Sequence, residues 1–282
     1  SLVIAVDPAL AGVKLQVFEN SDNLKIIDSF LPDLSAFPYN KLSSTNRVAK
    51  IAGIYNGKAY IVTYVVGGAN IIIYEYNLTT PNDLPVTYTK AFADFEICTL
   101  QESTGTIFLA GYIGTTLRVG KHVISTGTFT STTHTLAVDL IPKFLDLLTT
   151  NSTVRITGEA SGVVYSLVVA QSDLSISVSL LTWATASHYT TANDGNNTYL
   201  IYSVQISSST GSPYGSGCTI TAMNAAGTTN VLGAAYTVCG YSKITGKALY
   251  DFGLVYFNSV QGRVNTKSAF VPVSNTNATL IT

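Results

Sequence analysis

The chain has 282 residues, of which 46% are hydrophobic and only 11% are charged, and its formal net charge is −1. Because the basic and acidic residues are scattered with no basic run, the chain lacks the electrostatic field that attracts phosphates, and nucleic acid is excluded as an expected partner. No stretch reaches the roughly 18 to 20 consecutive apolar residues of a membrane-spanning helix, so we expect no membrane span.

The apolar residues follow the pattern of short β-strands joined by tight turns. A first meander, meaning antiparallel strands joined in sequence, is predicted with strands at residues 2–6, 13–19 and 24–30. The second meander has the clearest pattern of strands and turns. Asn56-Gly57, which favours a type I′ hairpin turn, joins Arg47–Tyr55 to residues 58–66, and Gly67-Gly68 leads into residues 69–76.

The same order of strands and polar or glycine-containing turns is repeated four more times. The predicted strands are 95–100, 106–113 and 117–124 in the third unit; 154–157, 163–170 and 174–183 in the fourth; a strand from His188, then 198–207 and 218–223 in the fifth; and 236–244, 248–257 and 264–273 in the sixth. Turns are predicted at residues 193–196 and at Thr245-Gly246-Lys247.

One segment, residues 140–148, fits two interpretations. Ile141, Phe144, Leu145 and Leu148 stand at helical spacing, and a proline is tolerated in the first turn of a helix. The same segment can also extend as an outer strand. Both interpretations stay open at this point.

The repeat length indicates an architecture. The second strands of successive units begin roughly 35 to 57 residues apart, with a mean near 47, and each unit has three or four strands. This pattern resembles the β-propeller architecture, which implies about six antiparallel blades in a single all-β repeat domain over residues 1–282. The chain has no repeated Trp-Asp pair, kelch double glycine or Asp-box, so no named propeller family is matched. Tandem β-sandwich domains are the alternative, because sandwiches also have short strands at regular spacing.

The three cysteines, Cys98, Cys218 and Cys239, allow two interpretations. Cys218 and Cys239 flank two strand-like runs and are candidates for a disulfide, with Cys98 free in the core. Alternatively, all three are small buried hydrophobic residues.

Four sequons make the chain a candidate glycoprotein, each in or beside a predicted turn: Asn77, Asn151, Asn196 and Asn277. Their number is what chance gives in a chain so rich in Ser and Thr. Only their placement in turns supports glycosylation.

No motif indicates catalysis or metal binding. None of the three histidines stands at the spacing of a zinc site: His122, His134 and His188. Asp94 and Glu96 are two apart on a predicted strand, a spacing that suits an acid and base or a calcium pair but is also typical of solvated acids. The turn at 193–197 lacks the acids of a calcium loop, and no nucleophile elbow or phosphate loop is present. We therefore expect no catalytic, cofactor-binding or metal-binding residue, no cofactor, and a protein that is not an enzyme.

Composition favours a non-catalytic protein on the outside of a cell or virion. A neutral surface rich in hydroxyl groups, with 17 tyrosines, suits self-association into a homo-oligomer or filament, as in a surface layer, appendage or fibre. The absence of a Met before Ser1 fits a mature secreted product or a trimmed chain.

The alternative function is an adhesin-like or lectin-like module that binds glycans or a receptor. Such a module would use loops such as 207–217, with tyrosines in place of further tryptophans beside Trp183. A glycoside-acting enzyme is the third hypothesis, and it requires a pocket with buried, convergent carboxylates.

Overall fold

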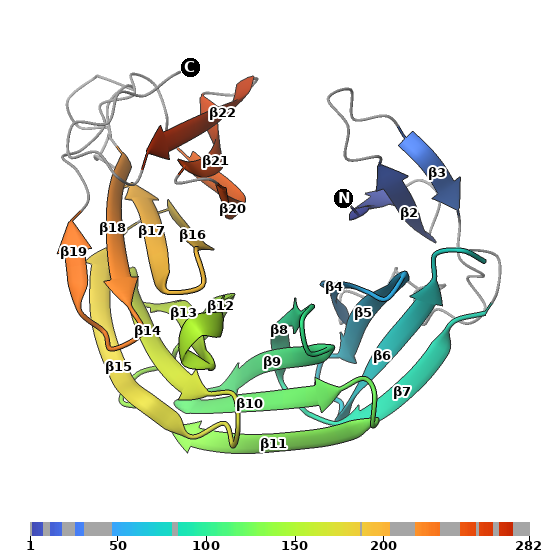
Figure 1. Cartoon of the computed structure of the whole chain (residues 1–282). Helices are drawn as coiled ribbons and strands as arrows, with labels where there is room; N and C mark the ends of the chain where they lie inside the picture. The colour runs from blue at the N-terminus through green and yellow to red at the C-terminus, as the bar shows by residue number, and fades with distance from the viewer. Residues whose placement is uncertain are drawn as a thin grey trace. The chain divides into compact units, whose positions relative to one another are not determined.

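The computed structural model describes residues 2–7, 12–18, 26–30, 47–80, 84–186, 188–203, 218–231, 243–251, 254–261 and 265–272. These residues contain no α-helix, and they are organised in six antiparallel sheets of three or four strands that are consecutive in sequence (Figure 1). Within the same residues, no helix is long and apolar enough to cross a membrane.

The chain divides into two compact units, residues 1–113 with 118–133 and residues 114–117 with 134–282. The single repeat domain over residues 1–282 stays a prediction.

The first unit holds three sheets. Their strands are β1 (Leu2–Asp7), β2 (Gly12–Phe18) and β3 (Ile26–Phe30); β4 (Arg47–Tyr55), β5 (Lys58–Val65), β6 (Asn70–Asn77) and β7 (Val86–Ala91); and β8 (Phe95–Gln101), β9 (Thr106–Ile113), β10 (Thr116–Val123) and β11 (Thr128–Thr135). The last residues of β11 and the first of β10 belong to the second unit.

Local chemistry explains the hairpins of the first unit. Asn56 and Gly57 have φ angles of 48° and 72°, as a type I′ turn requires, so the predicted β4–β5 hairpin is confirmed. Gly105, with φ 61°, ends the β8–β9 turn directly against the ring of Tyr55, where a Cβ atom would come within 2.6 Å of the ring. Only glycine fits this turn without displacing Tyr55.

The sheets β4–β7 and β8–β11 pack face to face through an apolar core. The core draws on both sheets, with Tyr60, Val62, Tyr64, Ile71 and Ile73 from one and Phe95, Cys98, Leu100, Ile107 and Leu109 from the other. Because β5 and β9 lie inside their sheets and are covered on both faces, their residues are almost continuously buried.

The second unit holds the remaining three sheets. Their strands are β12 (Ile141–Leu148), β13 (Thr153–Ala160), β14 (Val163–Ala170) and β15 (Ile176–Thr185); β16 (His188–Asn193), β17 (Asn197–Ser203), β18 (Cys218–Asn224) and β19 (Thr229–Val231); and β20 (Lys243–Asp251), β21 (Leu254–Gln261) and β22 (Asn265–Pro272).

In each unit the first strand of a sheet contacts the first strand of the next. The contacts run β1 to β4 to β8 in the first unit and β12 to β16 to β20 in the second. One hydrogen bond across the last pair joins the backbone N–H of Ala248 to Thr190 Oγ1 at 2.9 Å. Meanders that contact one another through their first strands are the blades of a β-propeller.

The predicted propeller of about six blades is therefore confirmed. The tandem-sandwich alternative is wrong, because sandwiches connect strands between two sheets, whereas every sheet here consists of strands consecutive in sequence.

Residues 141–148 form strand β12, so the helical interpretation of this segment is wrong. The strand pairs only with β13, and its register shifts between Pro142 and Phe144. A proline that cannot donate a ladder hydrogen bond is tolerated at such an edge. Pairing with β13 along its length thus overrides the helical spacing of the apolar residues.

Two other sequence-based assignments are corrected. The predicted turn at Thr245-Gly246-Lys247 lies inside β20, where a register shift between Thr245 and Leu249 absorbs the glycine as an irregularity of the strand. The outer strands β7, β11 and β19 were missed, because their polar residues do not alternate with a clear apolar set. The predicted binding loop 207–217 and most of the strand 236–244 lie outside the described residues.

Candidate functional site

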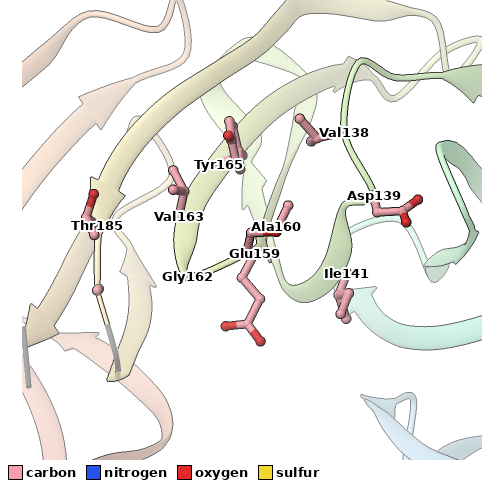
Figure 2. A pocket seen from close by; sticks show the side chains of 11 residues that line it. Val138, Asp139, Ile141, Glu159, Ala160, Gly162, Val163, Tyr165 and Thr185 are labelled. Atoms are coloured by element: carbon pink, nitrogen blue, oxygen red, sulfur yellow. The ribbon is translucent and has the colours of Figure 1, made fainter.

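A pocket of about 850 Å³ lies at one end of the sheet β12–β15 in the second unit (Figure 2). Three segments line it. The connection into β12 supplies Val138, Asp139 and Ile141; the β13–β14 hairpin supplies residues 159–163 and Tyr165; and the end of β15 supplies Thr185 and Ala186. The volume is within the range of small-molecule sites in proteins.

The β13–β14 hairpin shapes the floor of this pocket. Its turn residues Ser161 and Gly162 have φ angles of 50° and 78°, the two left-handed positions of a type I′ turn. The backbone N–H of Ala186 donates to the Gly162 carbonyl over 3.3 Å, which ties the end of β15 to the turn. These contacts hold the floor without using the side chains that face the pocket.

Strand register places the pocket side chains on two sides of the hairpin. Glu159 is opposite Ile141 on β12 and opposite Val164 on β14, so these three share one face of the sheet. Tyr165 comes one residue after Val164 and therefore faces the other way. In Figure 2 the side chains of Glu159 and Tyr165 point in opposite directions from the hairpin.

The lining is acidic and contains no basic residue. Asp139 is exposed and Glu159 is half-buried. Within the described part of the chain, neither carboxylate forms an ion pair, since the ion pairs there are Lys58–Glu75 and Arg118–Asp94. Burial, together with the adjacent Glu159 carboxylate, raises the pKa of the Tyr189 hydroxyl.

This pair of acids does not have the form of a glycosidase site. Neither carboxyl group is buried, and Figure 2 shows the two side chains on separate segments and pointing in different directions. Glycoside hydrolysis requires two carboxyl groups that face the same bond. The lining of this pocket thus holds no convergent pair of buried carboxyl groups.

The structure separates the predicted pair Asp94 and Glu96. Asp94 has φ 59° and precedes β8, while the register of β8 shifts between Phe95 and Ile97, so the two acids do not share a strand face. Asp94 lies 4.0 Å from Arg118 in an ion pair and accepts a long hydrogen bond from Tyr64 at 3.5 Å.

The oxygen-rich turn at 193–197 is internally satisfied. The Asp194 carboxylate accepts the backbone N–H groups of Asn196 and Asn197 at 2.8 and 2.6 Å, and the hydroxyl of Tyr199 at 2.6 Å. Burial opposes ionisation, but these hydrogen bonds outweigh it and lower the pKa of the Asp194 carboxyl. The turn uses its own carboxylate to hold its shape.

The histidines lie apart from one another. His122 is 0% exposed, His134 Nε2 is 2.8 Å from the Leu174 carbonyl oxygen, and His188 is half-buried at the start of β16. Among the described residues, no three His, Cys, Asp or Glu side chains come together as a metal site requires.

Of the cysteines, Cys98 is buried in the first core as a free thiol, and burial raises the pKa of its Sγ. Cys218 begins β18, and Cys239 lies outside the described residues. The predicted Cys218–Cys239 disulfide therefore stays a prediction.

Three sequon asparagines, Asn77, Asn151 and Asn196, are exposed, and the fourth, Asn277, lies outside the described residues. Asn77 Oδ1 accepts both the backbone N–H and the hydroxyl of Thr79, at 3.0 and 2.7 Å. The hydroxyl-bearing residue of the third sequon, Thr198, is instead 0% exposed within β17.

Trp183 is used for packing between two sheets. Its Nε1 donates to Thr221 Oγ1 at 2.9 Å, and its ring centroid lies 5.4 Å from the guanidinium carbon of Arg155. Sequence reasoning missed Arg155, whose side chain is fully buried. It also missed the pocket, because only strand pairing brings Asp139 and Glu159 to the same end of the sheet.

Known proteins resemble this chain in fold alone. No protein-family model and no curated protein matches the sequence. Among solved structures, hydrazine synthase from Kuenenia stuttgartiensis is similar at a TM-score of 0.64 and 7% identity, over 97% of this chain and 74% of that one. A protein from Lactobacillus plantarum is similar at 0.59 and 14% identity, over 100% and 80% of the two chains.

Against TolB from Acinetobacter baumannii the TM-score is 0.49 and the identity 11%, over 92% of this chain and 60% of the TolB chain. The chain thus spans less than two thirds of that structure. The resemblance to propellers is confirmed at the level of architecture by the six antiparallel meanders described above.

Proposed function

We propose that this protein is a non-catalytic binding protein of the cell or virion exterior that takes a hydroxyl-rich ligand, such as a glycan, in the pocket at the end of β12–β15. The observation that carries the proposal is the composition of that pocket. Its lining combines the hydroxyl and carboxylate groups of Asp139, Glu159, Tyr165 and Thr185 with apolar residues. Sugar sites combine hydrogen-bonding groups of this kind with an aromatic ring.

Tyr165 supplies the aromatic surface of this site. The chain has a single tryptophan, and that ring is already committed to Arg155 and Thr221. Tyr165 is only half-buried and lines the pocket, so its ring has a side available for stacking against a ligand.

A pair of matched variants tests the proposal. Thr185→Trp fills the mouth of the pocket from an exposed position on β15, and Thr130→Trp places the same side chain at an exposed position on β11. We expect binding to an immobilised panel of neutral and charged glycans to be lost in the first variant and kept in the second. Binding that survives Thr185→Trp would place the ligand elsewhere, and no binding by the unaltered protein would reject the proposal.

Self-association is a second candidate function, and strand β11 favours it. This strand pairs only with β10, and it has eight residues without a charge or a proline. Soluble proteins usually protect such edges with charges, prolines or bulges, because an unprotected edge can pair with a second copy.

Thr132→Lys within β11 tests this candidate, since a lysine on an edge strand blocks strand pairing. Light scattering across a concentration series is expected to show oligomers of the unaltered protein and monomers of the variant. A protein that remains monomeric at high concentration would reject the candidate.

A further inference from the structure

Strand β11 is the least protected edge among the outer strands that the structure describes. Each sheet ends in an outer strand that pairs with a neighbour on one side only. Soluble proteins protect such edges with charges, prolines, bulges or a short length. The other outer strands each have one of these devices: Asp28 in β3, Lys90 in β7, Lys267 and Pro272 in β22, repeated register shifts in β15, and a length of three residues in β19. In contrast, β11 has eight residues and no Lys, Arg, Asp, Glu or Pro.

Hydrogen bonding indicates which backbone groups of β11 face the free edge. The N–H of Leu136, directly after the strand, donates to the Thr115 carbonyl at 2.8 Å, and from this bond β10 and β11 continue with equal lengths of 8 residues, so neither strand has an inserted residue. The N–H and C=O groups of successive residues point alternately to the two sides of a strand. The residues of β11 that point away from β10 are therefore Phe129, Ser131, Thr133 and Thr135.

One antiparallel arrangement of two copies uses all of these outward groups. A two-fold axis beside Thr132 sets Ser131 opposite Thr133 of the second copy and Phe129 opposite Thr135 of the second copy, so every outward residue meets another outward residue. The same axis sets Thr132 opposite its own equivalent. Cross-strand pairs of Ser and Thr are favourable, and no like charges meet. The edge is thus complementary to itself, which favours a second copy of this chain over an unrelated strand.

We propose that two copies of this protein pair through β11 into a closed dimer with Thr132 on the two-fold axis. This inference rests on self-association, the second candidate function, and adds the geometry of the partner to it. Pairing one edge with the same edge of another copy occupies that edge on both copies, so assembly ends at a dimer, whereas a filament requires two different surfaces. Pairing along one strand buries little area, so the dimer is weak and forms as the concentration rises.

Single cysteines test the register. In the proposed dimer Thr132 and its equivalent form a pair without mutual hydrogen bonds, with Cα atoms about 4.5 Å apart, and a disulfide spans about 4.4 to 6.8 Å between Cα atoms. Thr132→Cys should therefore form a disulfide-linked dimer under mild oxidation that separates on reduction. Thr130→Cys is the matched control, because its equivalent lies roughly 13 Å away along the edge. Both variants keep the natural cysteines of the chain.

A second measurement leaves Thr132 unchanged. Because Ser131 lies opposite Thr133 of the second copy, an equal mixture of Ser131→Cys and Thr133→Cys should form a cross-linked dimer, and neither variant alone should do so. Light scattering of the unaltered protein across a concentration series should reach the mass of two chains and stop there.

The outcomes separate the inference from the candidate function on which it rests. Species larger than a dimer, or equal cross-linking of Thr130→Cys and Thr132→Cys, would overturn the closed dimer and leave self-association standing. A dimer that is cross-linked in neither cysteine test would overturn the pairing through β11. A protein that stays monomeric at every concentration and forms no cross-link would reject the inference and the candidate function together.

Discussion

The two units bury ionised side chains in opposite ways. In the first unit the buried charge is the Glu75 carboxylate, which accepts hydrogen bonds from Tyr60 at 3.1 Å and Tyr88 at 3.0 Å and forms an ion pair with Lys58. Burial alone raises the pKa of Glu75, but the contacts with Lys58 and Tyr88 outweigh it, and the pKa lies below its usual value. Because the Lys58 side chain is 41% exposed, this group keeps contact with water.

In the second unit the buried cation is the guanidinium of Arg155, and none of its partners among the described residues is exposed. It donates to Ser166 Oγ at 2.9 Å, to Met223 Sδ and to the Asn224 carbonyl, and its ring partner is Trp183. Asp146, opposite it on β12, is also 0% exposed. Burial lowers the pKa of Arg155 to about 10, against the opposing effect of Asp146.

Contact between the sheets of the second unit thus depends more on a single buried cation. Arg155 comes from β13, whereas Met223 and Asn224 come from β18, so its hydrogen bonds join two sheets. The acid of the first unit is held by strands of one sheet, β5, β6 and β7. Removing the buried charge should therefore lower the free energy of unfolding more in the second unit than in the first.

The largest effect is expected for Arg155→Met. The variant removes the hydrogen bonds to Ser166 and Asn224 and the positive charge that faces the buried Asp146 carboxylate. Leaving a buried charge without an opposite charge typically costs about 3 to 5 kcal/mol. Trp183, the only tryptophan of the chain, contacts Arg155 and gives a fluorescence signal for this region during denaturant unfolding. Adding Asp146→Asn should restore part of the loss. If the free energy of unfolding of Arg155→Met alone lies within about 1 kcal/mol of that of the unaltered protein, the contrast between the units disappears.

The next largest effect is expected to be a loss of stability of the first unit in acid. His122 is 0% exposed, and its ring lies 5.4 Å from that of Tyr88. Burial, and secondarily Lys90, lower the pKa of His122 to about 4. The folded state thus favours the neutral ring, so the stability is complete above the ordinary pKa of 6.5 and is lost as the pH falls from there toward 4.

His122→Phe removes this titration. Each pH unit within that window costs the unaltered protein up to roughly 1.4 kcal/mol, a loss that the variant does not share. Hydrogen exchange of β7 and β10 between pH 7 and pH 4.5 follows the effect, and these two strands should open in acid only when the histidine is present. If hydrogen exchange changes with pH in the same way in the unaltered protein and in His122→Phe, protonation of the His122 ring does not lower the stability.

The smallest effect is expected for Lys58→Met. Its ion pair with Glu75 is partly exposed, and Glu75 keeps the hydroxyls of Tyr60 and Tyr88. Partly exposed ion pairs contribute about 0 to 1 kcal/mol and weaken with salt. Chemical unfolding at low and high salt measures the change. A loss as large as that of Arg155→Met would mean that the two units bury charge in the same way.

Local sequence signals predicted the fold where backbone chemistry is decisive. Asn56-Gly57 and the apolar strands around it are sufficient for the β4–β5 hairpin, because the turn geometry and the strand pattern agree. The same signals failed at Gly246, which lies within a strand, and at β11, whose threonines look like a loop when burial is unknown. Pairing between strands decides such cases, and single-sequence patterns do not contain it.

The candidate site was much harder to predict than the fold. Asp139 and Glu159 are twenty positions apart and have ordinary neighbours in sequence, and the register of β12 against β13 alone brings them to one pocket. Arg155 likewise looks like a solvated charge between two apolar residues. Conversely, the turn at 193–197 has a visible pattern of oxygen ligands, but its carboxylate serves the turn itself.

The burial of Thr198 limits when Asn196 can be glycosylated relative to folding. A sequon is read through both its asparagine and its hydroxyl-bearing residue. In the folded sheet Asn196 remains accessible, while Thr198 is covered within β17. Any glycan on Asn196 must therefore be attached before β17 joins its sheet, whereas Asn77 and Thr79 stay exposed together after folding is complete.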